Sequence, residues 1–244
     1  EVGLSRSAQW CGDGRPCDFD TFVDLLSGVR DNPGDNVSLE DEPGNQLAGF
    51  DLRYSFDLFS QQLAFYTQWI GEDEQNGLPS AYMAQLGFET WGSWDGSGAS
   101  YRVHVEYNEP TCSAITDSDP NVGCAYNHHI YRNGYRYRGR AIGHSADTDS
   151  KVVSVGGMLF TAAGHTWQIL ARHGEINRFD TPRHSFAGLK QDISSLELRH
   201  ERRFPFGDLR VGVSTESVEE VATGMNFDES RAYVEFIYKL GGNE

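Results

Sequence analysis

The sequence predicts an all-β protein, a single domain over residues 1–244 built as an antiparallel transmembrane β-barrel of the outer-membrane type with one short N-terminal helix. Apolar and polar residues alternate with period two in segment after segment, as in strands with two different faces. Most of these segments are about ten residues long, whereas strands of globular proteins usually have five or six. Their polar faces carry charges of both signs, as the wall of a polar lumen does.

A soluble β-sandwich would show the same alternation, because its apolar face packs a core while its polar face meets water. Strand length, mixed charge and aromatic residues near the strand ends favour the barrel, in which aromatic girdles lie at the two membrane interfaces. These aromatic residues are Trp69, Trp91, Trp94, Tyr101, Tyr107 and Tyr238.

The first predicted element is a short helix over residues 18–28. Asp18 or Asp20 can cap its N-terminus, an apolar stripe follows, and Gly28 ends it. Residues 29–47 form an acidic stretch rich in turn residues, and we expect no long helix beyond it.

Alternating segments then follow one another to the end of the chain. The clearest are residues 49–58, 101–107, 208–215 and 231–240. Weaker alternation marks residues 61–70, 80–91, 152–162, 165–173 and 193–204. We therefore expect about nine or ten strands.

The predicted connections differ sharply in length. Those near residues 59–60, 163–164 and 205–207 are tight, whereas residues 108–151 form one long stretch. A connection of that length inside a compact domain is normally functional or disordered. Because long loops of such barrels face outward and short turns face the periplasm, we expect residues 108–151 to be extracellular or to fill the lumen.

Composition excludes two classes of protein. The chain has 36 acidic and 20 basic residues, a formal net charge of -16, and a pI near 4.8. A surface this acidic repels nucleic acid, so we expect no nucleic-acid partner. No apolar run approaches the roughly 20 residues that a transmembrane helix needs, which excludes a helical membrane protein.

The four cysteines predict two local disulfides, Cys11 with Cys17 and Cys112 with Cys124. Each pair closes a short loop rich in Gly, Pro, Asp and Ser. Neither pair has the spacing of a zinc knuckle. Disulfides indicate an oxidising compartment. Because no signal peptide is present, we expect Glu1 to be a mature terminus or an internal start.

Positive charge and aromatic rings gather in residues 131–150, within a chain that is otherwise strongly acidic. Guanidinium groups bind carboxylates bidentately, and aromatic faces can stack on the C–H faces of sugars. This combination predicts a site for an acidic polysaccharide that contains uronic acid units. The candidate binding residues are Arg132, Arg136, Arg138, Arg140, Tyr131, Tyr135, Tyr137 and His144.

A second interpretation of this stretch is internal. Because arginines and tyrosines alternate, Arg136, Arg138 and Arg140 can point into a barrel lumen and pair with carboxylates there. A mixed arrangement, partly structural and partly ligand-facing, also fits the pattern.

Histidines in this region raise the question of metal binding or catalysis. His128 and His129 are adjacent, so on a strand they would point to opposite faces and chelate poorly. His144 with Asp147 and Asp149 could hold a divalent ion or serve a hydrolase, but the sequence lacks a nucleophile elbow. We therefore expect no metal, no cofactor and no enzymatic activity.

Several segments resemble the capsule assembly Wzi family: residues 11–26, residues 42–56 and residues 131–150. The resemblance is strongest from Gln9 to Ser154. It implies a large monomeric barrel in the bacterial outer membrane, of which this chain would hold roughly the C-terminal half. It also implies lectin-like binding of capsular or exopolysaccharide, which the protein would help to assemble or anchor at the cell surface.

The partners implied by this resemblance are an acidic capsular or exopolysaccharide, outer-membrane lipid and polysaccharide export machinery. Two other functions fit a barrel. The first is a porin or passive outer-membrane transporter with an open lumen. The second is an outer-membrane barrel hydrolase that uses His144 with Asp147 or Asp149.

Overall fold

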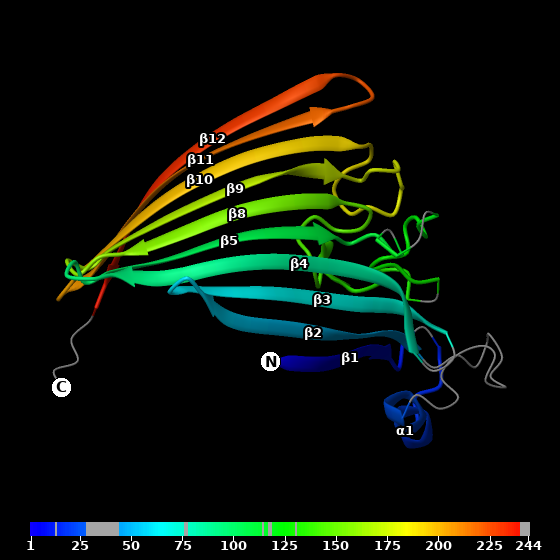
Figure 1. The fold of residues 1–244 in the computed structure, drawn as a ribbon. Helices are drawn as coiled ribbons and strands as arrows, with labels where there is room; N and C mark the ends of the chain where they lie inside the picture. The colour runs from blue at the N-terminus through cyan, green and yellow to red at the C-terminus, as the bar shows by residue number, and fades with distance from the viewer. Residues whose placement is uncertain are drawn as a thin grey trace.

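A computed structural model describes residues 1–12, 14–27, 44–75, 78–113, 115–116, 119–129 and 131–239. Within them, ten long strands form one sheet, and a two-stranded hairpin and one helix are added to it (Figure 1). The elements are β1 (Val2–Trp10), α1 (Phe19–Ser27), β2 (Gly44–Leu58), β3 (Gln61–Gln75), β4 (Leu78–Trp94), β5 (Ala99–Glu109), β6 (Arg136–Tyr137), β7 (Arg140–Ala141), β8 (Lys151–Phe160), β9 (His165–Ile176), β10 (Gln191–Phe204), β11 (Gly207–Glu220) and β12 (Met225–Tyr238).

The sheet is an antiparallel meander in the order β1-β2-β3-β4-β5-β8-β9-β10-β11-β12. Each strand pairs with the next long strand along the chain. Turns of two or four residues, such as Phe59–Ser60, join the strands at one end, called here the turn end, and the longer connections gather at the other, the loop end (Figure 1). This confirms the all-β antiparallel prediction and the contrast between tight and long connections.

Register gives the sheet two chemically different faces, because residues directly opposite one another on paired strands point to the same side. One row of partners runs across the apolar face and contains no charge: Tyr54, Phe65, Phe88, Val105, Val155, Ala171 and Leu196. The neighbouring row lies on the polar face: Arg53, Tyr66, Gly87, Glu106, Ser154, Arg172, Ser195 and Glu216. The alternation read from the sequence is therefore carried through the whole sheet.

The polar face is held by ion pairs between strands. Glu89 is buried and pairs with both Arg53 and Arg102, whose Nε lies 2.7 Å from a Glu89 oxygen. Further along, Arg210 joins Glu201 at 2.9 Å and Glu235 at 3.1 Å. Opposite charges that face each other across strands stabilise a sheet, and here they also satisfy carboxylates that would otherwise be buried alone.

The helix forms as predicted. The amide of Thr21 donates to Oδ1 of Asp18 at 2.8 Å, which is an N-cap, and Phe22 packs on Trp10 with ring centroids 5.2 Å apart. The predicted end at Gly28 lies outside the described residues. No helix among the described residues is long and apolar enough to cross a membrane.

One strand was not predicted. β1 pairs with β2 from Val2↔Leu52 to Trp10↔Gly44 and forms one edge of the sheet. Its segment lacks the clear alternation of the other strands because Arg6 interrupts the row of Val2, Leu4 and Ala8 on the apolar face. The strands β2 and β12 also begin earlier than predicted, at Gly44 and Met225.

Buried residues gather where the stretch between β5 and β8 packs against the polar face near the loop end. This stretch, residues 110–150, is called the loop segment below. Cys112, Ala125, Tyr126 and Tyr135 of the loop segment form one cluster with Leu47 and Met83 of the sheet. The loop segment therefore folds back over the wall.

Candidate functional site

The loop segment is tied at its base. Cys112 and Cys124 form a disulfide, as do Cys11 and Cys17, which confirms both predicted pairs. The amide of Ser113 donates to the carbonyl of Tyr82 in β4 at 3.0 Å. The loop segment is thereby joined to the neighbouring strand as well as to itself.

The arginine–tyrosine stretch forms a small hairpin, β6–β7. Its two turn residues, Arg138 and Gly139, both have positive φ, at 51° and 77°. Two consecutive left-handed residues are the signature of a type I′ turn, in which Gly is favoured. The turn carries Arg138 out to solvent at the tip, while Tyr135 and Arg136 stay at the buried base of the hairpin.

Tyr135 anchors this hairpin to the sheet. Its side chain is buried, and its hydroxyl donates to the carbonyls of Ser7 at 3.0 Å and Asn45 at 2.8 Å. Burial raises the pKa of Tyr135 to about 12, so the hydroxyl stays a donor at neutral pH. Tyr135 thus has a structural role between the loop segment and β1–β2.

Arg136 is also engaged inside the protein. Its guanidinium donates to the carbonyl of Tyr126 at 2.8 Å, to Oδ1 of Asn127 at 2.6 Å and to Oδ1 of Asp147 at 2.6 Å. The side chains of Arg136 and Asp147 are 9% and 1% exposed. The sequence allowed two roles for these arginines, ligand binding or internal pairing with a carboxylate. Arg136 has the second role, and its partner Asp147 lies in the loop segment itself.

Asp147 accepts from several donors besides Arg136. The amide of Ser185 donates to Oδ2 at 2.9 Å and the amide of Thr148 donates to Oδ1 at 2.8 Å. Although burial opposes ionisation, the hydrogen bonds from Ser185 and Arg136 outweigh it and hold the pKa of Asp147 below its usual value. The carboxylate therefore stays charged and joins the loop segment to the connection between β9 and β10.

Arg132 and Arg138 are exposed and lie in a cavity of about 740 Å³, called the cationic pocket below. No aspartate or glutamate is among its described lining residues. The lining comprises Asn127, His128, His129, Arg132, Asn133, Arg136, Arg138, Gly139, Pro182, Arg183 and Ser185. A pocket with four arginines and no acid stands out on a chain of net charge -16.

Aromatic rings flank the arginines of this pocket. The guanidinium carbon of Arg138 lies 5.3 Å from the centroid of the Tyr137 ring, and Tyr137 is 65% exposed. The rings of His128 and His129 contact each other at a tilt, with centroids 4.4 Å apart, and the ring centroid of Tyr131 lies 5.9 Å from that of His128. The pocket therefore offers cationic donors and ring faces to the same ligand.

Arg183 is a pocket residue that the sequence did not reveal. It comes from the connection between β9 and β10, and its Nη1 donates to the carbonyl of Gly123 at 3.3 Å. It lies outside the arginine–tyrosine stretch, so composition gave no signal for it. His128 and His129 were considered only as metal ligands, although both line the pocket.

Of the eight predicted site residues, only Arg132, Arg136 and Arg138 line the cationic pocket, while Tyr131, Tyr135 and Tyr137 lie beside it and Arg140 and His144 lie elsewhere. Arg140 is exposed in β7 but is not among the lining residues of the cationic pocket. His144 lines a second cavity, of about 520 Å³, between the loop segment and the polar face, together with Gln68, Gln85 and Glu106. Burial lowers the pKa of His144, so its ring is neutral at pH 7.

The geometry does not assemble a catalytic or metal-binding group around His144. Nδ1 of His144 accepts from the amide of Ala146 at 3.2 Å. Asp147 is taken up by Arg136 and Ser185, and Oδ2 of Asp149 accepts from the amide of Gly123 at 2.7 Å. Within the described part of the chain, no hydrogen bond links His144 to either carboxylate, and no three His, Cys, Asp or Glu side chains form a metal cluster.

A long-stranded antiparallel sheet with one face apolar along its middle, one ion-paired face and a loop segment folded over the latter is the wall of a β-barrel. The sequence of this wall identifies it further. The chain matches the family described as capsule assembly protein Wzi over residues 1–229, and it belongs to that family.

Two relatives show the extent of the similarity. The chain is 40% identical over 106 residues to an uncharacterised 55.8 kDa protein of the cps region of Klebsiella pneumoniae, covering 43% of this chain and 20% of that protein. It is also similar to the solved structure of Wzi from Escherichia coli, reported as an outer membrane protein involved in group 1 capsule assembly and a carbohydrate-binding β-barrel. That match has a TM-score of 0.70 at 24% identity and covers 96% of this chain and 46% of Wzi. The chain thus spans less than half the length of either relative.

Proposed function

We propose that this chain is part of a bacterial outer-membrane barrel that binds capsular or exopolysaccharide and helps to assemble or anchor it at the cell surface. The observation that carries this proposal is the cationic pocket: clustered arginines, no acid among the described lining residues, and flanking aromatic rings on a strongly acidic chain. Membership of the Wzi family and the carbohydrate binding reported for the E. coli protein support it.

The ligand that fits the cationic pocket is an acidic sugar. Arg132 and Arg138 are exposed and have no acidic partner among the described residues, so their guanidinium groups are free to take a carboxylate bidentately. The exposed ring of Tyr137 lies beside Arg138 and can stack on a sugar ring. Each contact is weak, but a polymer presents the same unit many times, and repeated engagement raises the avidity.

The further partners of this proposal are outer-membrane lipid around the apolar face and the polysaccharide export machinery, with the protein acting as a monomer. The position of the loop segment favours this lectin-like function over a porin. It packs on the polar face at the loop end, where an open channel would need its mouth. The carboxylates of Asp147 and Asp149 are engaged by Arg136, Ser185 and Gly123 and not by the ring of His144, which favours binding over hydrolysis.

The proposal is tested by binding of the purified protein to an acidic capsular polysaccharide and to the same polymer after chemical reduction of its carboxyl groups. We expect salt-sensitive binding of the acidic polymer and at least tenfold weaker binding of the reduced one. The single variants Arg132→Ala and Arg138→Ala should each bind the acidic polymer about tenfold more weakly, a loss of about 1.4 kcal/mol of binding free energy.

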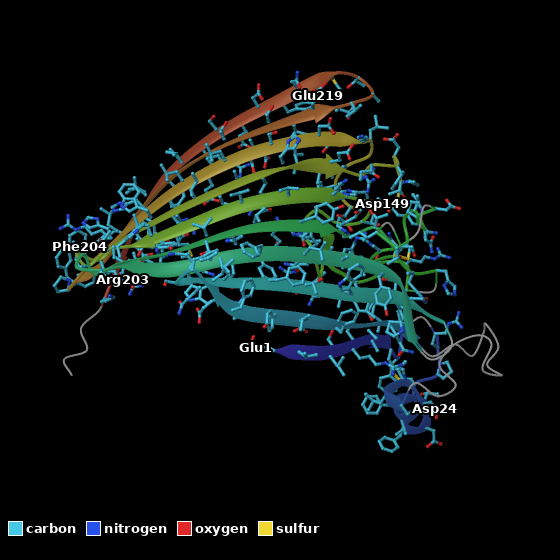
Figure 2. All side chains as sticks on the ribbon, in the orientation of Figure 1. Glu1, Asp24, Asp149, Arg203, Phe204 and Glu219 are labelled. Atoms are coloured by element: carbon cyan, nitrogen blue, oxygen red, sulfur yellow. A yellow bond between two sulfur atoms is a disulfide. The ribbon has the colours of Figure 1, made fainter. Side chains whose placement is uncertain are left out.

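The control is Arg203→Ala, which removes another exposed arginine, one that pairs with Glu201 at the turn end (Figure 2). It should leave binding unchanged. Equal affinity for the acidic and reduced polymers, or equal loss in Arg203→Ala and Arg138→Ala, would show that the cationic pocket is not the polysaccharide site.

A further inference from the structure

A second basic cluster lies on the other side of the sheet, far from the cationic pocket. Nδ1 of His165 in β9 lies 2.9 Å from Nε2 of His200 in β10. Arg202 is the register partner of His165, so its Cβ lies about 5 Å away on the same face. Since His200 pairs with Trp167 and Val211, strand parity puts all three basic residues on the apolar face.

Arg202 is exposed and has no acidic partner among the described residues. Its guanidinium carbon lies 4.9 Å from the centroid of the Phe204 ring instead. The acidic residues that the register places on the apolar face lie towards the opposite, loop end of the sheet: Glu109, Glu175, Asp192, Glu219 and Asp228. They outnumber the bases there, such as Lys151, the register partner of Glu175. The turn end of this face is therefore basic and the loop end acidic, as the separate positions of Phe204 and Glu219 illustrate (Figure 2).

Aromatic rings surround the basic cluster. Trp167 packs on His200 with centroids 4.1 Å apart and is 42% exposed. Phe204 stacks on Phe206 at 5.4 Å, and Phe206 is exposed as well. Below these rings towards the loop end begins the uncharged belt of Ile169, Leu198 and their register partners.

A basic cluster at the edge of an uncharged belt lies at the depth of the lipid headgroups in a bilayer. Aromatic residues of a barrel lie at headgroup depth, and the short turns face the periplasm. The cluster then lies at the headgroups of the periplasmic leaflet, where the available anions are lipid phosphates. A single uncompensated positive charge at this depth favours a lipid that carries a net negative charge.

We infer that His165, His200 and Arg202 bind the headgroup phosphate of an anionic phospholipid whose acyl chains lie along the apolar face. Arg202 supplies the charge and a bidentate donor pair. One ring N–H joins His165 to His200, so the neutral pair has one remaining ring N–H to donate to the phosphate. This inference rests on the membrane location in the proposed function, but not on the cationic pocket or on any sugar.

The test is native mass spectrometry of the full-length protein in detergent, titrated separately with phosphatidylglycerol and phosphatidylcholine. We expect phosphatidylglycerol to bind at least fivefold more tightly. Arg202→Gln and the double variant His165→Gln, His200→Gln should each lose most of that preference. The matched control is Arg203→Gln, one residue along the same strand on the polar face, which should keep it.

Three outcomes separate the possible explanations. Glycerol phosphate at millimolar concentration should not displace the lipid, and if it does, the site binds free phosphate and the lipid assignment is wrong. If the protein inserts into vesicles but binds the two lipids equally, the inference is wrong. It is also wrong if Arg202→Gln and Arg203→Gln lose the preference for phosphatidylglycerol equally. Failure to insert into vesicles at all overturns the membrane location, and with it both this inference and the proposed function.

Discussion

At the scale of single residues, Arg132, Arg136 and Arg138 belong to one short stretch but have different roles. Arg136 is held by Tyr126, Asn127 and Asp147 in a buried network. Arg132 and Arg138 are exposed in the cationic pocket. The difference is burial: a guanidinium removed from water must be paired, whereas an exposed one can exchange water for a ligand.

We therefore expect Arg136→Ala to destabilise the loop segment by about 3 kcal/mol, because it leaves the buried carboxylate of Asp147 uncompensated. Limited proteolysis in a urea series would report this as earlier cleavage between residues 110 and 150. Arg140→Ala removes an exposed arginine of the same hairpin and should change stability by less than about 0.5 kcal/mol. Equal effects of the two substitutions would contradict the structural role of Arg136.

At the scale of elements, Asp149 connects three segments at the loop end. Its amide donates to the carbonyl of Pro110 at 3.0 Å, and its own carbonyl accepts from the amide of Arg178 at 2.8 Å. Its buried carboxyl accepts from the amide of Gly123 at 2.7 Å. The two ends of the loop segment and the connection after β9 are thus joined at one residue.

This residue should make the loop segment sensitive to pH. Burial raises the pKa of Asp149 to about 6, above the roughly 4 of an unfolded aspartate. A raised carboxyl pKa contributes stability that is fully present below about pH 4 and is lost as the pH rises through 6, at most about 3 kcal/mol. Hydrogen exchange at the amide of Gly123, corrected for intrinsic rates, should show more frequent opening at pH 8 than at pH 5.

Asp149→Asn should remove this dependence, because an amide does not ionise but can still accept from Gly123. Asp147 acts in a different window: its pKa is lowered, so its contribution is lost only as the pH falls below about 4. The control Asp95→Asn replaces an exposed aspartate at the turn end and should leave the pH dependence of Gly123 unchanged. Persistence of the dependence in Asp149→Asn would assign it to another group.

At the scale of the whole molecule, the sheet separates two environments across one layer of backbone. The apolar face has no packed partner among the described residues, and large apolar side chains such as Val155 and Leu196 stay close to half exposed. A face of this kind and extent is stable only against lipid or another apolar surface. The polar face carries ion pairs between its own strands, and the loop segment packs on part of it.

Substitution of two adjacent residues by arginine should therefore cost very different amounts of folding free energy. Leu196→Arg places a charge midway along β10 on the apolar face and should cost about 2–4 kcal/mol of folding free energy in phospholipid vesicles. Ser195→Arg places it on the polar face between Arg172 and Glu216, where repulsion by one neighbour is offset by attraction to the other, and should cost less than about 1 kcal/mol. Denaturant titration of the protein in vesicles would measure both, and similar losses would show that the apolar face does not contact lipid.

Much of the fold was readable from the sequence alone. Period-two alternation predicted nearly every long strand and the chemical difference between the two faces, because side-chain direction in a strand follows directly from residue parity. The capped helix and the two disulfides were predicted from local spacing. β1 was missed because Arg6 breaks its alternation, and an edge strand is recognised mainly by its hydrogen-bonded neighbour.

The sequence also determined that positive charge and aromatic rings would gather in residues 131–150. Only the tertiary structure decided which of these residues face a ligand. Arg136 and Tyr135 are buried by partners as far away in the sequence as Arg183 and Ser7, while Arg183 joins Arg132 and Arg138 in the cationic pocket. Alternation assigns a residue to a face of a strand, but irregular loops have no period, so burial and pairing there depend on long-range contacts that no local pattern encodes.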